Sequence, residues 1–361
     1  MDFGVWDHID RSALGTGEQF ETRLKLAEAY DAAGFYAYHV AEHHGTPFGL
    51  APSPGIFFAA IAQRTRRLRF GPLVYLLPLY HPLRLYDEIC MLDQLSGGRF
   101  ELGVGRGISP HELGIFGVDP NESHARFKEA LALILQACVS ETLNFEGEFY
   151  SARDVPLLLK PVQTPHPPLW YGAIKPDTAD WAARNNMNIV CGNGPTVEIR
   201  AVTDRYRAVW QELGHGRAAL PKLGMTRQLV IADTDEEAAR IARRAFKLYR
   251  SNFVSLWERR GDPLAAVLMP EDYAAVEQHG EALAGSAETV RRTLLKQVTE
   301  AGTNYLVCRF AFGDLSFEES RRSLRLFVEN VMPGLRPVET GDMKGPTSGG
   351  SMAPNAKVSR S

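Results

Sequence analysis

Three adjacent residues, Glu42, His43 and His44, carry side chains suited to acid–base chemistry. An imidazole can donate or accept a proton near neutral pH, and a neighbouring carboxylate such as that of Glu42 can fix the tautomer of His43. The cluster follows the run 36–41, which is aromatic and β-branched, begins after a helix-ending Gly34 and therefore predicts a strand. Polar side chains at the end of such a strand usually face a pocket, so we expect the cluster to be catalytic or ligand-binding.

The same segment also fits a zinc motif. His39, Glu42 and His43 match H-x-x-E-H, the inverted zinc-protease signature. That signature requires a helix, which would bring His39 and His43 onto one face. Because successive side chains of a strand point to opposite faces, a strand would separate Glu42 from His43, and we expect no metal site here. A third interpretation is that the histidines only form hydrogen bonds at the strand end.

A glycine loop over residues 98–108 is the second candidate site. Arg106 lies there between Gly105 and Gly107. Glycines let backbone N–H groups approach an anion and an arginine adds a permanent charge, so the loop could bind phosphate. A Rossmann interpretation is weak, because the third glycine of G-x-G-x-x-G is missing and we expect no helix to open directly at Pro110. A glycine-rich turn with a surface arginine is the alternative.

A third candidate site lies at residues 172–183, where a strand gives way to a helix. Asp177 or Thr178 could cap that helix, and its free N–H groups beside Lys175 would suit a phosphate. An ordinary capped helix explains the same residues. The apolar segment 70–82 could in addition form a flat wall for an aromatic ring system, although such segments more often belong to the core.

These sites need a scaffold that brings strand ends together. Short β-like runs alternate with helical patterns such as 18–33 and 124–138, which is typical of βα units and a parallel sheet. Eight such pairs predict an α/β fold of the (β/α)8 type, a TIM barrel with insertions, in preference to a doubly wound sheet with fewer strands. The eight runs are 1–6, 36–41, 68–73, 100–103, 168–172, 188–191, 223–232 and 304–310.

Two regions lie outside this repeat. Residues 246–284, between the seventh and eighth runs, are longer than a usual connection, and insertions of this kind are often lids. Residues 336–361 contain hardly any bulky apolar side chain, so we expect a disordered tail. We therefore expect one barrel domain over 1–335 and a tail over 336–361.

The composition narrows the function class. The 361 residues carry a net charge of −3 with both signs interleaved, which argues against nucleic acid as a partner. The four cysteines are far apart among apolar neighbours, as in reduced cytoplasmic proteins. No stretch of 18 uninterrupted apolar residues and no leader is seen, so we expect neither a membrane span nor a signal peptide, and a cytoplasmic location.

Taken in order, several motifs resemble the bacterial luciferase-like flavin monooxygenase family over residues 1 to about 335. Each motif alone is weak evidence for the family, but the order and spacing of the motifs together are highly specific. The matching segments are Phe3-Gly4, Ala41-Glu42-His43-His44, Leu77-Pro78, His81-Pro82, residues 92–100 and 103–107, Phe116-Gly117-Val118-Asp119, Arg126-Phe127-Lys128-Glu129, residues 323–327 and Val331-Met332-Pro333.

The resemblance implies a luciferase-like barrel that binds FMN, usually reduced by a separate flavin reductase. With dioxygen and a C4a-hydroperoxide on the flavin, such a barrel oxidises a small-molecule substrate. The resemblance also implies a homodimer. His43 matches the family's catalytic histidine, and Glu42 and His44 complete that motif.

The resemblance also implies a set of cofactor-binding residues. Arg106 matches the family's phosphate-binding arginine, while Lys175 and Thr178 fall where the family holds the same phosphate. Thr178 keeps the family's residue, whereas Lys175 departs from its serine. The full expected set is Leu73, Val74, Arg106, Ile108, Ile174, Lys175 and Thr178.

Two further positions follow from the resemblance. Leu73 and Val74 lie where the family has a non-prolyl cis peptide under the flavin ring, and we expect that bond here. Gly105 stands where the light-emitting α subunit has a reactive cysteine, which argues against light emission. Two alternatives stay open: hydride transfer with the deazaflavin F420 and no oxygen, and a barrel that binds flavin without turnover.

Overall fold

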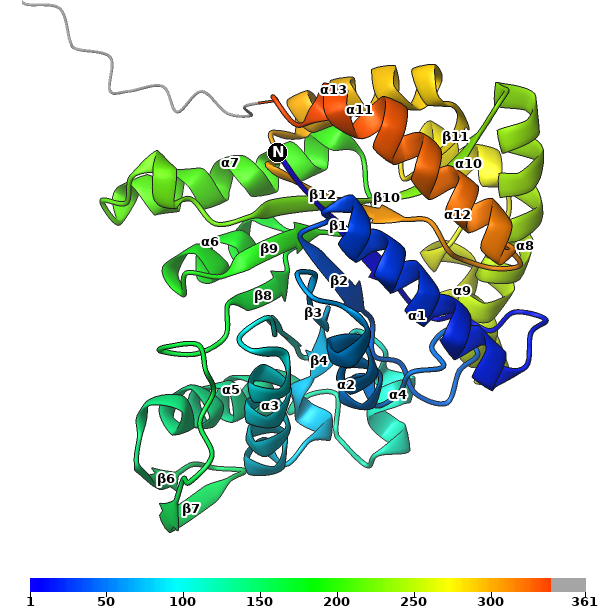
Figure 1. The fold of residues 1–361 in the computed structure, drawn as a ribbon. Coiled ribbons are helices and arrows are strands. Elements are labelled where there is room, and N and C mark those ends of the chain that lie inside the picture. The colour runs from blue at the N-terminus through cyan, green and yellow to red at the C-terminus, as the bar shows by residue number, and fades with distance from the viewer. Residues whose placement is uncertain (339–361) are drawn as a thin grey trace, which may run out of the picture.

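The computed structural model describes residues 1–338, and shows a ring of parallel strands with helices outside it (Figure 1). Nearly all of the predicted tail over 336–361 therefore lies outside the described residues. All eight predicted runs form strands, which confirms the (β/α)8 barrel. The barrel strands are β1 (Asp2–Asp7), β2 (Ala37–Val40), β3 (Arg69–Pro72), β5 (Leu102–Gly105), β8 (Leu169–Gly172), β9 (Asn188–Cys191), β10 (Leu223–Ala232) and β12 (Tyr305–Arg309).

Parallel pairing runs around the whole ring. The order is β3, β2, β1, β12, β10, β9, β8 and β5, and a parallel bridge between Phe70 and Phe100 joins β5 back to β3. The short β4 (Tyr75–Leu76) continues β3 and pairs with β5. Because every barrel strand runs in the same direction, all their carboxyl ends open on one face of the molecule.

Helices cover the outside of the barrel. The predicted helices over 18–33 and 124–138 are present, as α1 and α5 of the series that follows. In chain order the helices are α1 (Thr16–Ala33), α2 (Pro54–Arg64), α3 (Pro82–Ser96), α4 (Pro110–Ile115), α5 (Ser123–Val139), α6 (Pro176–Arg184), α7 (Thr196–Glu212), α8 (Asp235–Arg259), α9 (Ala265–Leu268), α10 (Tyr273–Gln278), α11 (Ala287–Ala301), α12 (Phe317–Leu326) and α13 (Met332–Leu335).

Local sequence explains several of these boundaries. Gly34 ends α1 in the left-handed conformation, with φ 76°. Its N–H donates to the carbonyls of Tyr30 and Asp31 in the last turn of the helix. The expectation that no helix opens at Pro110 was wrong. Proline is well suited to the first position of a helix, where no N–H bond is lost, and Ser109 caps α4 by accepting the N–H of Glu112 at 3.3 Å.

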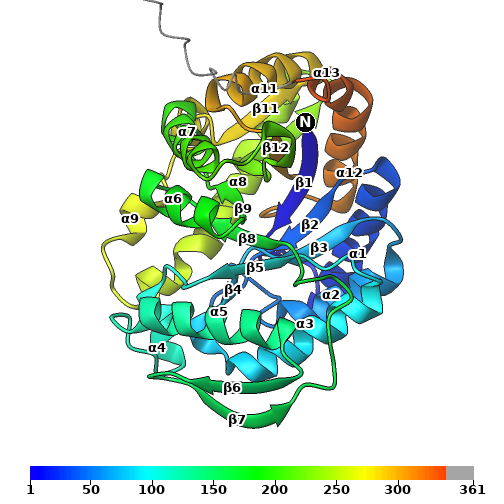
Figure 2. The ribbon, with the colours of Figure 1, turned by 90° about the vertical axis from the view of Figure 1, so that its left-hand side faces the viewer.

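Two insertions interrupt the repeat. The hairpin of β6 (Thr142–Glu146) and β7 (Ser151–Pro156) lies outside α3 and α5 (Figure 2). The segment 246–284 begins inside α8, which continues to Arg259, and it then holds α9, α10 and part of β11 (Ala282–Ser286). Strand β11 pairs with the last residues of β10.

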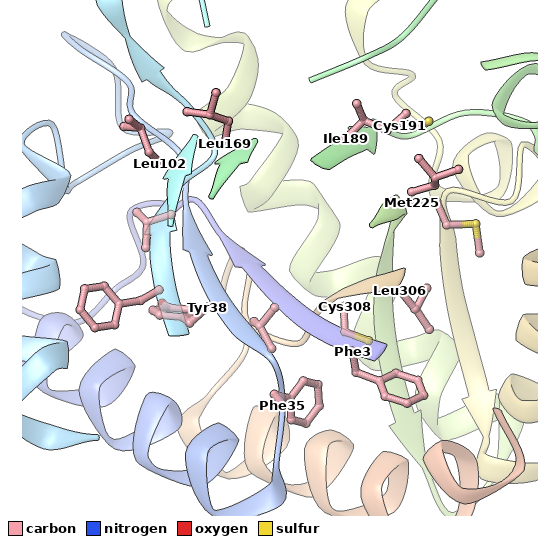
Figure 3. Packing of buried hydrophobic residues seen from close by; sticks show 14 of the residues in the cluster. Phe3, Phe35, Tyr38, Leu102, Leu169, Ile189, Cys191, Met225, Leu306 and Cys308 are labelled. Carbon is pink, nitrogen blue, oxygen red and sulfur yellow. The ribbon is translucent and has the colours of Figure 1, made fainter. Parts of the chain in front are cut away.

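The core lies between the strands and the helices (Figure 3). Alternate strand residues such as Tyr38, Leu102 and Leu306 point outwards into this layer and are fully buried. All four cysteines are free and buried, as expected of reduced core thiols. Among the described residues, no helix has the length and apolar character needed to cross a membrane.

The amino end of the barrel is filled by a polar plug around Glu101, which is fully buried. Its carboxylate accepts hydrogen bonds from the side chains of Arg69, Trp170 and Tyr36, the last at 2.7 Å. The side chain of Tyr305 occupies the space beside Gly4, where a Cβ would collide with it. Because these side chains fill the amino end, a ligand would enter the described barrel from the carboxyl ends of the strands.

Candidate active site

The predicted catalytic cluster lies at the carboxyl end of β2, as the sequence indicates. His39 is in the strand, fully buried, with its Nε2 3.1 Å from the hydroxyl of Tyr305. His43 instead lies beyond the strand, at the open end of the barrel, where its side chain is 20% exposed. Residues 37–40 form a strand that ends before His43, so the helical geometry that the zinc signature needs is missing.

The imidazole of His43 is held by Glu112, a residue of α4 that sequence reasoning missed. Its Nδ1 is 3.0 Å from Oε1 of Glu112, and the same oxygen accepts the backbone N–H of His44 at 3.3 Å. The Glu112 carboxylate accepts both bonds, so Nδ1 of His43 carries the proton and Nε2 is the nitrogen available to a reactant. The pattern Ser109-x-x-Glu112 is a helix-start signature and could have indicated this residue.

Glu42 points away from His43 and supports His44 instead. Its carboxylate is fully buried, bonds Nε2 of His44 at 2.8 Å and accepts the N–H of Leu76 at 3.1 Å. Burial raises the pKa of Glu42, and the bonds from His44 and Leu76 oppose that rise. Of the two roles open to Glu42, fixing the His43 tautomer or forming a structural hydrogen bond, the structure shows the second, and the carboxylate that bonds His43 is that of Glu112.

A narrow apolar pocket adjoins His43. It is lined by His43, Thr46, Phe48, Ile108, Ser109, Glu112 and three α8 residues, Phe253, Leu256 and Trp257. The start of segment 246–284 thus lies beside the catalytic cluster. His8, which follows β1, stacks on His43 with ring centres 5.6 Å apart. Burial, with added repulsion from Arg309 and His43, lowers the pKa of His8 well below its ordinary value, so His8 is neutral.

The peptide bond between Leu73 and Val74 is cis, which confirms the prediction for this position. It connects β3 to β4, and Leu73 packs with Trp6, Trp170 and Val190 inside the barrel. A Cβ on Gly105 would lie only 2.4 Å from Cγ2 of Val74, so a cysteine at this position would collide with Val74.

The expected phosphate-binding residues lie at the ends of two neighbouring strands. Arg106 follows β5, and Ile174, Lys175 and Thr178 follow β8, which pairs with β5. Arg106 is exposed, and no acidic group within residues 1–338 forms an ion pair with it. The Thr178 hydroxyl donates to the carbonyl of Lys175 at 2.6 Å and accepts its N–H at 3.2 Å, which fixes the start of α6.

These donors fit a phosphate group of the FMN type. Two cationic side chains, Arg106 and Lys175, lie at the open end of the barrel formed by the carboxyl ends of the strands, which we call the mouth. They are beside the first turn of α6, and the start of a helix is a common binding site for anions. Gly107 has φ 83°, a conformation that glycine adopts without strain, and it turns the chain from Arg106 to Ile108. Ile108 and Ile174 are 72% and 66% exposed, so both leave apolar surface free at the mouth.

Comparison with known proteins agrees with this arrangement. The family model described as "Luciferase-like monooxygenase" matches residues 1–305. The chain is 45% identical to the protein y4wF of Sinorhizobium fredii over 89% of this chain and 93% of that protein. It is 26% identical to the oxygenase component of the flavin-dependent trigonelline monooxygenase of Acinetobacter baylyi, over 92% and 95% of the two chains. The crystal structure of the monooxygenase RslO1 from Streptomyces bottropensis superposes with a TM-score of 0.83 at 28% identity, covering 92% of this chain and 99% of that one.

Proposed function

The chain belongs to the luciferase-like monooxygenase family, an oxidoreductase family with flavin-dependent members, and from this premise we propose that it oxidises a small organic substrate with reduced FMN and dioxygen. The observation that carries the proposal is the His43–Glu112 pair at the barrel mouth. A flavin reductase would deliver the reduced cofactor, since a similar protein is named as an oxygenase component. The homodimer and the cytoplasmic location stay predictions.

The residues that would hold FMN are those at the ends of β3, β5 and β8. Arg106 and Lys175 would bind its phosphate, Thr178 would keep the α6 start in place, and Ile108 and Ile174 would flank the cofactor. Leu73 and Val74 would support the ring system. When bound and reduced, FMN supplies the electrons that activate dioxygen.

His43 is placed to move a proton in this reaction. Glu112 keeps its Nδ1 protonated, so Nε2 can accept a proton from a reactant and return it, while the buried carboxylate balances the imidazolium charge. The aromatic rings of Phe48, Phe253 and Trp257 line the adjoining pocket and exclude water. Water in the pocket would let the activated oxygen be lost as hydrogen peroxide before it reaches the substrate.

The first test is anaerobic titration of the purified protein with reduced FMN and, separately, with reduced F420, followed by admission of oxygen. We expect tight binding of reduced FMN and consumption of oxygen. Binding of F420 alone, without oxygen consumption, would contradict the proposal and favour hydride transfer. Binding of FMN without any turnover would favour a flavin carrier.

The His43→Ala variant tests the role of the imidazole. We expect unchanged affinity for reduced FMN but faster release of hydrogen peroxide after oxygen is added, on the order of 100-fold if proton transfer is the main loss. Glu112→Gln should shift the same rate in the same direction by a smaller factor.

His166→Ala is the matched control, because within residues 1–338 the hydrogen bond of His166 goes to the carbonyl of Pro167, in the loop before β8 at the closed end of the barrel. Equal peroxide release from the wild type and His43→Ala would remove His43 from the mechanism.

A further inference from the structure

Strand β12 ends with Arg309, whose side chain lies inside the barrel and whose residue is only 1% exposed. Its guanidinium lies 4.7 Å from the ring centre of Trp6 and 5.4 Å from that of Tyr249. One nitrogen, Nη1, donates to the hydroxyl of Tyr249 at 2.6 Å. Its Nε has no hydrogen-bond partner within the described part of the chain.

Other polar atoms around Arg309 are also unpartnered. Among residues 1–338, Nε1 of Trp6, Nδ1 of His8 and Oε1 of Gln228 are buried without a hydrogen bond. Gln228 is the register partner of Arg309 across β10 and β12. The ring centre of His8 lies 4.6 Å from that of Trp6 and 6.0 Å from that of Tyr249, the two rings that Arg309 contacts. Three strands, β1, β10 and β12, therefore direct unsatisfied polar groups into the same part of the barrel.

The charge of Arg309 is not balanced by these neighbours. No carboxylate of the described residues lies within ion-pair distance of it, and His8 is neutral. Burial raises the pKa of Glu281 and the charge of Arg309 opposes that rise, but the two side chains form no ion pair. The buried Arg23 differs, because it forms an ion pair with Asp7 at 2.8 Å. A buried guanidinium that has no counter-ion and also leaves a nitrogen without a hydrogen-bond partner is costly, so its presence indicates a site that a ligand completes.

We propose that the substrate carries an anionic group, a carboxylate, which enters the barrel mouth and pairs with Arg309. The carboxylate would accept hydrogen bonds from Nε of Arg309 and from Nε1 of Trp6. This proposal rests on the proposed function, since Trp6 packs in the same cluster as Leu73 and Val74, where the flavin ring would lie. The class of substrate is then a small organic acid.

Calorimetric titration with acetate, hexanoate and benzoate tests this proposal, with benzamide as the uncharged analogue of benzoate. The protein is used both without flavin and saturated with oxidised FMN. We expect at least one carboxylate to bind and benzamide to bind far more weakly. Arg309→Met should weaken carboxylate binding roughly ten- to a hundredfold, the range for a lost charged hydrogen bond, and leave FMN affinity unchanged.

Thermal unfolding adds a readout that a structural arginine would not share. Arg309→Met should be at least as stable as the wild type, because it removes an unpaired buried charge. The matched control is Arg227→Met, since buried Arg227 bonds Gln297 and the Thr226 carbonyl, both at 2.8 Å, and should lose stability without losing carboxylate binding. If Arg309→Met does not fold, Arg309→Gln decides the binding question.

Failure of every carboxylate to bind the wild type, or equal binding by the Arg309 variants, would overturn the anion site. Loss of FMN affinity in Arg309→Met with carboxylate affinity unchanged would also overturn it. FMN affinity is measured separately, so Arg309-dependent carboxylate binding in a protein that binds no FMN would contradict the proposed function and leave the anion site standing.

Discussion

At the scale of single residues, the function of each side chain at the mouth depends on which partner holds it. His43 and Glu42 are adjacent in the chain, yet they bind different groups, because the backbone after β2 turns one towards Glu112 and the other towards His44. The carboxylate that bonds Nδ1 of His43 belongs to Glu112, which is 69 residues away in the chain. Chemistry at this site therefore depends on long-range contacts.

Arg106 allows a sharp test at this scale. Replacing it with alanine should weaken FMN binding by about 1.5–3 kcal/mol, because a charged hydrogen bond to the phosphate would be lost. The binding of riboflavin, which has the same ring system but no phosphate, should not change. Fluorescence titration with both flavins measures the two affinities, and Arg153→Ala on the exposed β7 strand serves as the control.

An equal loss of affinity for FMN and riboflavin would show that Arg106 supports the mouth as a whole and does not bind the phosphate.

At the scale of elements, α8 reaches over the mouth and is tied to α4. The ring of His111 in α4 meets that of Trp257 in α8 edge-on, with centres 4.9 Å apart, and its Nε2 is 2.8 Å from Oδ2 of Asp262. Helix α4 also carries Glu112, so one contact joins the apolar wall of the pocket to the helix that holds His43. Segment 246–284 therefore supplies part of the pocket wall, through Phe253, Leu256 and Trp257, and its action as a lid stays a prediction.

Loosening this tie should admit water to the pocket. We expect His111→Ala to increase amide hydrogen exchange at the end of α8 and to increase hydrogen peroxide release after oxygen is added to the reduced, FMN-loaded protein. His215→Ala is the matched control, because His215 also packs on a tryptophan, Trp210, but lies just beyond the end of α7. Faster exchange without more peroxide would show that α8 does not protect the reaction.

At the scale of the whole molecule, Asp10 joins three parts of the open end of the barrel. It follows β1 and is fully buried, and its Oδ2 accepts the side-chain N–H of Asn252 in α8 at 3.1 Å and the N–H of Gly313, which follows β12, at 2.9 Å. Burial raises the pKa of Asp10 from 3.8 to about 7, against the opposing effect of Arg23 and these bonds. A titratable group therefore sits where three segments meet.

The raised pKa predicts how stability depends on pH. Between pH 4 and pH 7 the folded protein keeps the Asp10 proton that the unfolded chain has released, so the free energy of unfolding falls as pH rises through this range. Asp10→Asn stays neutral and keeps the acceptor oxygen, so it should lose less stability on going from pH 4 to pH 7, by up to about 4 kcal/mol.

Chemical unfolding of both proteins at the two pH values measures this difference. Parallel pH profiles for the wild type and Asp10→Asn would show that Asp10 is ionised in the folded protein.

The sequence alone determined the scaffold and the location of the first candidate site. Eight runs of β-forming residues alternate with helical patterns. Each run forms the predicted strand, because local β propensity and the hydrophobic pattern agree there. Such a pattern also places Glu42, His43 and His44 at a strand end, since strand boundaries depend on neighbouring residues. Resemblance to a known family placed the cis bond after Leu73.

Only the tertiary structure decided which groups act together. Glu112, His8 and Arg309 come from a helix, a loop and a strand, and hydrogen bonding between residues 69 positions apart leaves no periodic signal in the chain. Arg309 gives no sign in the sequence that it lacks a counter-ion, because ion pairing depends on what the fold packs around a side chain. The strands could be predicted because they depend on local pattern, whereas the partners of the site's side chains could not, because they depend on how the barrel closes.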